Sequence, residues 1–572
     1  MRKLLRTSVG LATAALAVLA CTTPATPASA ADAPYDVLVF SKTAGFRHDS
    51  IAVGTQTIRD LGAANSFTVT ATEDAAVFTT GNLAQYEAVI FLNTTGDVLN
   101  NSQQSAFESY IGSGGGYVGV HSAADTEYGW SFYGNLVGAY FRSHPAIQQA
   151  TVRVENRAHA ATAHLPQNWV RTDEWYDFQS NPRANARVLA NLNESTYSGG
   201  VMGADHPIAW CKTYNGGRSF YTGGGHTQAS YAEPAFRAHL LGGIRYAAGR
   251  TKADCRPETG YTTLYNGSTS GWSQAGPGSF SNSDATLTSV GGMGLFWHSA
   301  KQFTNYSLKL DWRVAGDDNS GVFIGFPPSS DPNSAINNGY EVQIDPTDAA
   351  DRTTGAVYGF QAADLAARDA ALNPAGEWNT YELLVEGERL QVFLNGSKIN
   401  DFTNTDPVRS LAGHIGIQNH GTGDDVSFRN IRIRELGGTN PPPDGDRTGR
   451  ITGLAGKCLD VRNGSSANGT QIQLWSCNGG AAQTWTVTPN STIRALGKCL
   501  DVNGAGSADG TKIQLWTCNG GGAQVWSAQS NGTLRNPNSG KCLDVSNNSS
   551  ADGQAVHLWT CHTGANQRWV LP

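Results

Sequence analysis

The chain has 572 residues, a formal net charge of −7, 15% charged residues and 67 glycines. This length exceeds what one hydrophobic core normally serves, so we expect three or four domains. The low charge content and abundant glycine favour a turn-rich extracellular protein, and the absence of a basic stripe argues against nucleic acid as a partner.

The first 30 residues have the pattern of a secretory signal peptide. Basic residues at the start precede an apolar stretch, Val9 to Ala20, that is too short to span a membrane. Ala28-Ser29-Ala30 forms a small-residue cleavage site, after which we expect the secreted protein to begin. Cys21 follows a sequence similar to a bacterial lipobox, so a lipid anchor there is the alternative. No other segment is apolar and long enough for a membrane span.

The cysteines also indicate export. One of the nine lies in the predicted signal peptide, and an even number in a secreted chain favours disulfides. Six of the remaining eight form three pairs of constant spacing near the C-terminus, and we expect each pair to be bonded. The expected disulfides are Cys211–Cys255, Cys458–Cys477, Cys499–Cys518 and Cys542–Cys561.

Residues 33–256 alternate between strand and helix patterns. Buried strands are predicted at 35–41, 88–93 and 117–121, and helices at 52–64 and 102–113. This alternation predicts an α/β domain with a doubly wound, mostly parallel sheet. In such sheets the ligand crevice lies at the carboxyl ends of the strands.

Five motifs of this region resemble the ThuA-like family, named for trehalose utilisation. They are VFSKTAGFRHDSI (39–51), GGGYVGVHSAADTEY (114–128), RTDEWYDF (171–178), DHPIAW (205–210) and GGGHT (223–227). The resemblance implies a fold related to class I glutamine amidotransferases. Those enzymes carry a nucleophilic Cys where this chain has His121-Ser122, so we expect no amidotransferase chemistry.

Imidazoles and carboxylates remain at the predicted carboxyl ends of the strands. Such groups suit general acid–base catalysis or a divalent metal, although several can equally be structural histidines. The sequence identifies no particular cofactor, and a divalent metal is the one candidate. The candidate crevice residues are His48, His121, Asp125, Glu174, His206 and His226.

Residues 258–436 carry short alternating segments separated by Gly, Asn, Asp and Pro, which predict an all-β antiparallel sandwich or jelly roll without helices. No long linker precedes them, so we expect close docking on the α/β domain. In GYEVQID (339–345), Tyr340, Val342 and Ile344 fall on one face of a strand. Glu341, Gln343 and Asp345 fall on the other, which is either a solvated outer face or a site.

This region resembles the DUF1080 family of 3-keto-disaccharide hydrolases. The motifs are NSGVF (319–323), GYEVQID (339–345), TGAVYG (354–359), PAGEWN (374–379) and GHIGIQNHG (413–421). The resemblance implies a concanavalin-like sandwich that cleaves a glycoside whose sugar carries a ketone at C3.

A ketone at C3 acidifies the C2 hydrogen, so a base can remove it, the C1 substituent leaves by elimination, and water adds back. The reaction needs a base, an acid and groups that polarise the ketone. Glu341, Asp345 and His420 can act as base and acid. The amides that can orient the sugar or its enolate are Asn319, Gln343 and Gln418.

Two other functions remain open. Glu341 to Asp345 has the spacing of the E-x-D-x-E signature of glycoside hydrolase family 16, a family of retaining glycosidases. Four strand residues span about 13 Å, whereas a retaining carboxylate pair lies about 5.5 Å apart. The retaining reaction therefore ranks second. The other alternative is a multivalent carbohydrate-binding protein without catalysis.

Residues 437–446 are rich in Gly and Pro and predict an exposed linker. Residues 447–572 contain three repeats of about 42 residues, each with a Lys-Cys-Leu-Asp start and a Gln-x-Trp end. They resemble the ricin B-type lectins, which implies a β-trefoil carbohydrate-binding domain. We expect an oligo- or polysaccharide as partner and the Gln-x-Trp residues in the core.

The resemblance implies a sugar site in each repeat, in which a carboxylate accepts sugar hydroxyls and an indole stacks on the ring. Only the third repeat has Asn before Gln-x-Trp; the others have Ala482 and Ala523. The candidate residues are Asp460, Trp475 and Asn478; Asp501, Trp516 and Asn519; and Asp544, Trp559, His562 and Asn566.

Overall fold

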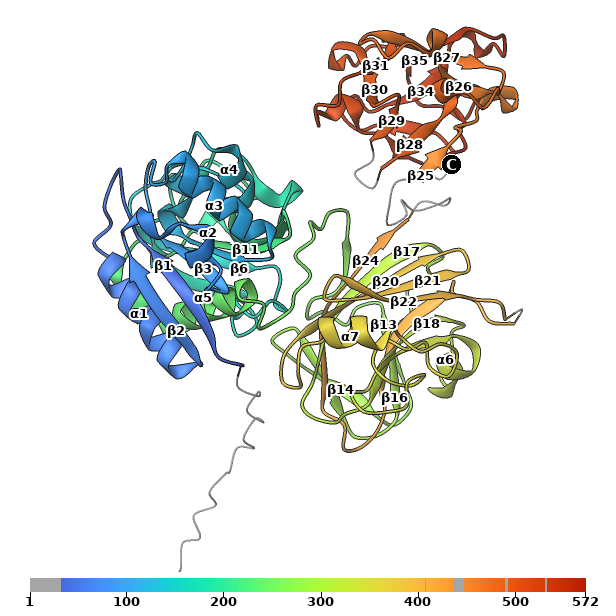
Figure 1. Ribbon diagram of the computed structural model, residues 1–572. Coiled ribbons are helices and arrows are strands. Elements are labelled where there is room, and N and C mark those ends of the chain that lie inside the picture. The colour runs from blue at the N-terminus through green and yellow to red at the C-terminus, as the bar shows by residue number, and fades with distance from the viewer. Residues whose placement is uncertain (1–31, 407, 437–446, 489–491, 530–531) are drawn as a thin grey trace, which may run out of the picture.

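The computed structural model describes residues 32–406, 408–436, 447–488, 492–529 and 532–572. The predicted signal peptide, Cys21 and the predicted linker at 437–446 lie outside this range. The described residues form three bodies in chain order, an α/β domain, a β-sandwich and a β-trefoil (Figure 1). Among the helices of these residues, none has the length and apolar character needed to cross a membrane.

The α/β domain is built on a nine-stranded sheet of order β2-β1-β3-β4-β11-β10-β9-β6-β7. The first five strands are parallel and the last four antiparallel. Their bounds are β1 Tyr35–Phe40, β2 Phe67–Thr72, β3 Ala88–Leu92, β4 Gly116–Val120, β6 Gln148–Val154, β7 Asn168–Asp173, β9 Arg187–Leu192, β10 Pro207–Tyr214 and β11 Gly217–Thr222.

The antiparallel half differs from the mostly parallel sheet that the sequence predicts. The change of direction occurs at Asn215-Gly216, where both residues have positive φ, of 49° and 92°. A two-residue Asn-Gly turn of this kind matches the twist of paired strands and closes a hairpin between β10 and β11. The Asn-Gly turn joins β10 directly to β11 without a crossover helix, so the two strands are antiparallel.

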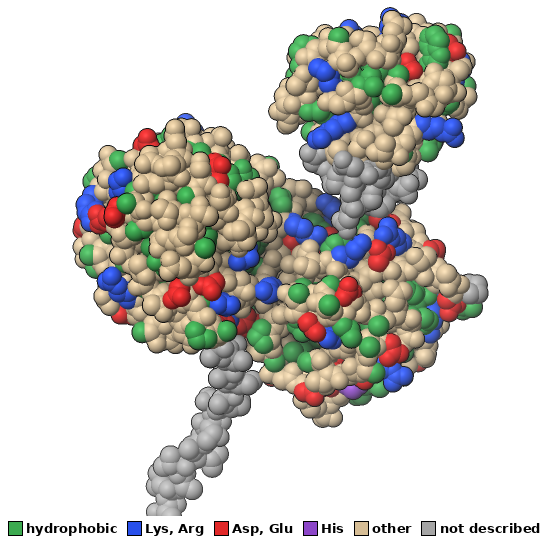
Figure 2. All heavy atoms as spheres, in the orientation of Figure 1, with side chains coloured by type: hydrophobic (Ala, Val, Ile, Leu, Met, Phe, Trp, Pro, Cys, Tyr) green, Lys and Arg blue, Asp and Glu red, His purple; other side chains and the backbone are tan. Residues whose placement is uncertain are grey.

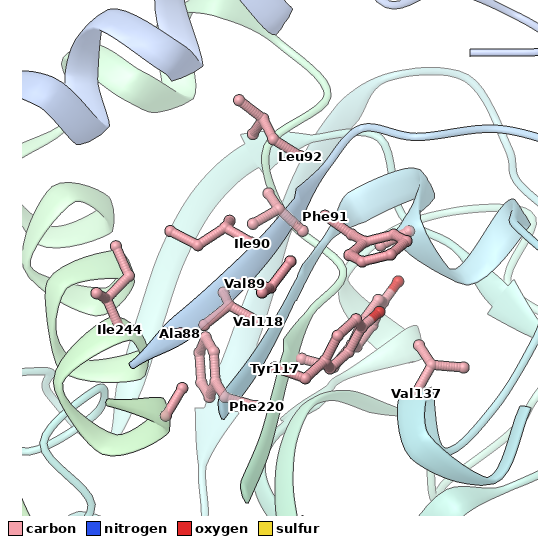
Figure 3. Packing of buried hydrophobic residues seen from close by; sticks show 14 of the residues in the cluster. Ala88, Val89, Ile90, Phe91, Leu92, Tyr117, Val118, Val137, Phe220 and Ile244 are labelled. Atoms are coloured by element: carbon pink, nitrogen blue, oxygen red, sulfur yellow. The ribbon is translucent and has the colours of Figure 1, made fainter. Parts of the chain in front are cut away.

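Helices cover the parallel strands on both faces: α1 Ile51–Ala64, α3 Asn101–Gly112, α4 Ser131–Val137 and α5 Pro234–Ala247. Successive side chains of the central strands point alternately toward the helices on one face of the sheet and those on the other (Figure 3). Phe220 of β11 packs where Gly243 of α5 has no side chain, while Phe91 of β3 meets the rings of Phe107 and Tyr133. Asn100 and Gln103 form a capping box that starts α3.

The sandwich has two antiparallel sheets with a shared apolar core. One contains β12 Thr262–Tyr265, β14 Ser279–Ser283, β15 Thr286–Val290, β17 Tyr306–Val314, β20 Asn379–Glu386, β21 Arg389–Leu394, β22 Ser397–Thr403 and β24 Val426–Glu435. The other, of order β13-β16-β23-β18-β19, contains β13 Trp272–Ala275, β16 Gly294–His298, β18 Ser320–Phe326, β19 Tyr340–Ile344 and β23 His414–Asn419. Two short helices were not predicted, α6 Asn333–Asn338 and α7 Leu365–Ala371.

The α/β domain and the sandwich dock closely, as the short junction predicts, and ion pairs join them. Arg245 pairs with Glu377 at 2.8 Å, and Arg187 pairs with Glu258 at 2.9 Å. Lys309 is buried and donates to Asp254 at 2.9 Å. On the outer surface, the visible face of the α/β domain carries basic and acidic side chains that are interspersed (Figure 2).

The trefoil repeats the same short strands three times around one core. Its strands are β25 Arg447–Gly449, β26 Cys458–Val461, β27 Thr470–Trp475, β28 Trp485–Val487, β29 Ile493–Ala495, β30 Lys498–Val502, β31 Ile513–Trp516, β32 Ser527–Ala528, β33 Leu534–Asn536, β34 Lys541–Val545 and β35 Gln554–Trp559. The Gln-x-Trp tryptophans are buried, and Trp485 donates to the Leu459 carbonyl at 2.8 Å. This confirms their predicted core role.

The eight cysteines of the described residues form four disulfides. They are the pairs expected from the sequence: Cys211–Cys255, Cys458–Cys477, Cys499–Cys518 and Cys542–Cys561. Cys211–Cys255 ties β10 to the segment that leads into the sandwich, across a sequence separation of 44.

Replacing both Cys211 and Cys255 with Ala is expected to destabilise the α/β domain by about 4 kcal/mol. A loop of this length, once released, adds that much conformational entropy to the unfolded chain. Calorimetry of the α/β transition measures the effect, with the Cys458/Cys477 double variant as the control that leaves this transition in place. A loss below about 1 kcal/mol would contradict the prediction.

Candidate functional site

A cavity of about 200 Å³ lies on the outer face of the sheet that contains β19. The apolar side chains of β19 point into the sandwich core, so its polar alternation faces the cavity. Five of the six predicted catalytic residues line it: Asn319, Glu341, Gln343, Gln418 and His420. Apolar lining comes from Met293, Phe323, Pro332 and Ile336, with Tyr358 beside them.

Glu341 is the carboxyl group of this cavity. Its side chain lies on the same sheet face as its β18 partner Phe323, and the residue is only 6% exposed. Burial raises the pKa of Glu341 to about 8, because the charged form loses its hydration. The carboxyl group is therefore mostly protonated at neutral pH and can donate a proton.

A chain of hydrogen bonds connects Glu341 to Asp345. In the orientation that satisfies both ends of the amide, the Gln343 amide nitrogen donates to Glu341 Oε1 at 3.1 Å. The Gln343 amide oxygen then accepts from Asn319 Nδ2 at 3.3 Å. Asn319 Nδ2 also donates to Asp345 Oδ2 at 2.9 Å. These amides fix the position of the Glu341 side chain.

Asp345 does not line the cavity, although the strand pattern predicts it on the same face. Strand β19 ends at Ile344, and the chain then turns. Asp345 Oδ1 accepts from the backbone N–H groups of Thr347 and Asp348 at 2.9 and 3.0 Å. Asp345 is therefore a turn-forming residue that positions Asn319.

His420 stands at the rim of the cavity. Its Nδ1 lies 3.0 Å from Asp424 Oδ2, which is the geometry of an imidazole oriented by a carboxylate. With the Nδ1 proton on this bond, Nε2 is free to accept a proton. Gln418, beside it, has a buried Oε1 without a hydrogen-bond partner among the described residues. An unpaired buried oxygen in a cavity is suited to a hydroxyl of a bound molecule.

A second group of side chains meets at the carboxyl edge of the α/β sheet. His48 follows β1, His121 follows β4, Glu174 follows β7 and His226 follows β11. His121 has a left-handed backbone, with φ of 49°. This strained conformation is found at functional positions that follow a strand.

Burial acts on the pKa values of three of these side chains, His48, Glu174 and His226, and hydrogen bonding acts in the opposite direction on those of Glu174 and His226. Burial, aided by His121 and His226, lowers the pKa of His48 to about 3 and keeps that ring neutral. Burial opposes the charge of Glu174, but its bonds with His121 and His226 outweigh burial and lower its pKa. Burial would lower the pKa of His226, yet Glu174 raises it.

Two predicted crevice residues lie apart from this group. His206 contacts Glu194 at 2.8 Å through Nδ1 and the Tyr176 carbonyl at 2.8 Å through Nε2, so both ring nitrogens are used within the fold. Asp125 accepts from the Tyr128 hydroxyl at 2.6 Å.

Two further residues support the group, and neither is among the candidates predicted from the sequence. His144 contacts the second oxygen of Glu174 at 3.0 Å. Asp173 accepts from the backbone N–H groups of Gly225, His226 and Thr227 and so holds the GGGHT loop. Asp173 directly precedes Glu174 in the motif RTDEWYDF, and this position was the signal in the sequence that could have identified it.

Each trefoil repeat presents a half-exposed tryptophan beside a buried aspartate. Trp475, Trp516 and Trp559 are 38–40% exposed, unlike the buried Gln-x-Trp rings. The aspartates are Asp460, Asp501 and Asp544, and each accepts from the glutamine of its own Gln-x-Trp motif.

The third repeat differs from the other two at its aspartate. Asn566 Nδ2 donates to Asp544 Oδ2 at 2.8 Å, and His557 Nε2 contacts Oδ1 at 2.9 Å. His562 Nε2 lies 3.4 Å from the same carboxylate. Asn478 and Asn519 instead accept from the backbone of their own turns, at Gly480 and Gly521.

Family models match the chain in three consecutive regions. Residues 36–247 match ThuA, described as trehalose utilisation. Residues 260–434 match a 3-keto-alpha-glucoside-1,2-lyase-like domain, and residues 447–569 match the ricin-type beta-trefoil lectin domain. The three matches follow one another along the chain in this order. The resemblances drawn from the sequence motifs are thereby confirmed.

Curated relatives match short stretches of this chain. A ribosome-inactivating protein of Polygonatum multiflorum, PMRIPt, is 46% identical over 52 residues, and nigrin b of Sambucus nigra is 45% identical over 49. Each match covers 9% of this chain and 9% of the relative. The chain thus spans about a tenth of the length of these relatives.

Solved structures are similar to the three parts separately. A ThuA-like protein of Bacteroides uniformis is 25% identical over 39% of this chain and 94% of its own, with a TM-score of 0.34. A protein described as a glycosyl hydrolase, from Parabacteroides distasonis, is 24% identical over 31% and 99%, with a TM-score of 0.27. Agglutinin from Abrus precatorius is 32% identical over 23% and 50%, with a TM-score of 0.21.

Proposed function

We propose that this protein is a secreted enzyme that cleaves glycosides carrying a 3-ketone in its sandwich and holds glycans with its trefoil. The observation that carries the proposal is the cavity on β19, which is lined both by Glu341, whose pKa burial raises to about 8, and by the His420 imidazole that Asp424 orients. The match to a 3-keto-alpha-glucoside-1,2-lyase-like domain supports the same chemistry. Four disulfides support an extracellular location.

The two groups divide the proton transfers of the elimination. His420 Nε2 removes the proton from C2 while the C1–O bond breaks, and Glu341 protonates the departing oxygen. This leaves a double bond between C1 and C2, conjugated to the ketone. Water then adds to C1 as Glu341 accepts its proton, and His420 returns a proton to C2. The sum of these steps is hydrolysis.

The amides of the cavity hold the sugar in this mechanism. Gln418 Oε1 accepts from a sugar hydroxyl, because no protein donor among the described residues satisfies it. Asn319 and Gln343 keep Glu341 in place. This scheme needs no second carboxylate near Glu341, so it accommodates the position of Asp345 at the turn. A retaining mechanism needs that second carboxylate in the cavity.

Turnover of a 3-keto-glycoside beside its unoxidised parent tests the proposed reaction. We expect cleavage of the ketone-bearing glycoside only, with deuterium at C2 of the product when the reaction runs in D₂O. Both assays are repeated with a chelator to determine whether a metal takes part. Equal turnover of the two substrates without deuterium at C2 would support the retaining glycosidase instead.

The lectin repeats favour a second activity, retention on a polysaccharide. Asp544→Ala or Trp559→Ala is expected to weaken retention more than Asp460→Ala or Trp475→Ala, because only the third repeat has Asn566 beside its aspartate. Retention of each variant on an insoluble polysaccharide measures the difference. Equal losses from Asp460→Ala and Asp544→Ala would show that the repeats bind alike.

A further inference from the structure

Three imidazoles and one carboxylate converge in the α/β domain from four separate segments. One donor atom of each of His48, His121, Glu174 and His226 lies within 4.8 Å of every other. All four follow strands that end at the same edge of the sheet, so the fold itself brings them together. This cluster belongs to a different domain from the cavity on β19 and shares no residue with it.

Three of the donor atoms form a tight triangle. His121 Nε2 lies 3.1 Å from His226 Nδ1 and 3.4 Å from Glu174 Oε2, and His226 Nδ1 lies 3.0 Å from the same oxygen. Ligand atoms at the corners of a tetrahedron around Zn²⁺ lie about 3.3 Å apart when the metal–ligand bonds are about 2.0–2.1 Å. The triangle therefore has the dimensions of one face of a zinc coordination tetrahedron.

The hydrogen bond at Nδ1 of His121 determines whether Nε2 presents a proton or a lone pair. Nδ1 lies 2.9 Å from the Gly223 carbonyl, an acceptor, so Nδ1 carries the proton. In the neutral ring, Nε2 then directs a lone pair at a carboxylate oxygen. Such a contact is unfavourable unless a cation, either a metal ion or a proton, lies between the two atoms.

The surroundings orient the four donors as supporting residues do in metal sites. The Gly223 carbonyl fixes His121, and Ser122 Oγ lies 3.3 Å from His48 Nδ1. His144 contacts the outer oxygen of Glu174 at 3.0 Å. Bonds of this kind fix the tautomer and direction of metal-ligating side chains.

We propose that His48, His121, Glu174 and His226 bind one divalent transition-metal ion of the zinc type. Imidazole and carboxylate donors suit Zn²⁺ and its first-row neighbours. The donor set contains no Cys, and mixed His and carboxylate sets are typical of catalytic rather than structural zinc. The side chain of His226 is 20% exposed and that of His144 is 42% exposed, so the site opens to solvent on their side.

Two other clusters of possible ligands occur in the part of the chain that the structure describes, and the fold accounts for both. Both nitrogens of His206, near Asp177 and Glu194, contact protein oxygens. Cys211 and Cys255, near His159, are joined in a disulfide. The proposal therefore predicts one high-affinity ion per chain rather than several.

Metal content of the tag-free full chain tests the proposal. Protein stripped with chelator, loaded with Zn²⁺ and dialysed is expected to retain about one ion per chain by mass spectrometry. Glu174→Gln and His226→Ala are expected to retain less than roughly a tenth of that amount. His164→Gln is the matched control, because its exposed ring contacts the Ala235 carbonyl in the same domain and is not part of the cluster.

Loading with Co²⁺ gives a second readout that does not depend on activity. We expect the visible absorption bands of Co²⁺ with a low coordination number and nitrogen and oxygen ligands in the wild-type protein and in His164→Gln. These bands should be lost in Glu174→Gln. Circular dichroism checks that each variant is folded. The proposal is overturned if the stripped wild-type protein retains no Zn²⁺, in which case a proton occupies the cluster, or if the ligand variants retain as much as the control.

Discussion

Replacing Glu341 with Gln is expected to lower turnover of a 3-keto-glycoside by about 10²–10⁴-fold, the range for loss of a positioned general acid. The Gln side chain preserves the shape of the cavity and the contact with Gln343, but it cannot transfer a proton to the departing oxygen. Steady-state kinetics on the ketone substrate measures the effect, and we expect it in kcat with little change in KM.

The pH profile distinguishes the role of Glu341 from a structural one. If Glu341 donates the proton, turnover by the wild-type enzyme falls as pH rises through about 8, where the buried carboxyl group ionises. The Glu341→Gln variant lacks this descending limb. If turnover by the wild-type enzyme instead rises through about pH 8, Glu341 is the base. If Glu341→Gln turns over as fast as the wild-type enzyme, Glu341 takes no part in catalysis. Glu435→Gln, at an exposed pair with Lys301, is the control.

Asp345 is expected to act through other residues. Asp345→Asn weakens the turn at Thr347 and the hold on Asn319, so its loss of rate should be smaller than that of Glu341→Gln. The descending limb of the pH profile should remain in this variant, because Glu341 is intact. Disappearance of that limb would place Asp345 in the proton transfer itself.

The strand period explains how much of the sandwich site the sequence could predict. Alternation within GYEVQI places Glu341 and Gln343 on the face opposite Val342, and the structure puts both at one cavity. The period says nothing about where a strand stops. Asp345 leaves the face because β19 ends one residue earlier and the chain turns back.

The α/β domain shows a different limit. The rule that ligand crevices lie at the carboxyl ends of strands brought together His48, His121, Glu174 and His226. It could not exclude His206, because the sequence does not give the sheet order that pairs β10 with β9 and leaves His206 beside Glu194. It also missed His144, which follows the short strand β5, Phe141–Ser143.

The domain junction could be predicted as close but not as charged. A junction without a flexible linker implies docking, yet the three carboxylates around Lys309 come from separate segments. Asp254 precedes the junction, Glu258 lies within it, and Glu382 is on β20. A pattern read one segment at a time cannot assemble such a network.

Replacing Lys309 with Met is expected to lower the free energy of unfolding by about 3–5 kcal/mol, because the buried carboxylates then have one cation fewer beside them. The Lys309 side chain is 4% exposed and lies 2.9, 3.4 and 3.7 Å from Asp254, Glu258 and Glu382. Met fills the same volume but supplies no charge. Differential scanning calorimetry should show the first transition lowered by roughly 10 °C, because each kcal/mol moves Tm by a few degrees in a domain of this size.

Lys301→Met is the matched control for Lys309→Met. Lys301 pairs with Glu435 on the surface of the same sandwich, where both side chains are about half exposed. Water screens such a pair, so its loss should change stability by less than about 1 kcal/mol. Because Asp254 belongs to the segment before the sandwich, Lys309→Met should also speed proteolysis at the junction, while Lys301→Met should not. Equal melting temperatures for the two variants would mean that Arg256, Arg187 and Arg432 alone neutralise the buried carboxylates.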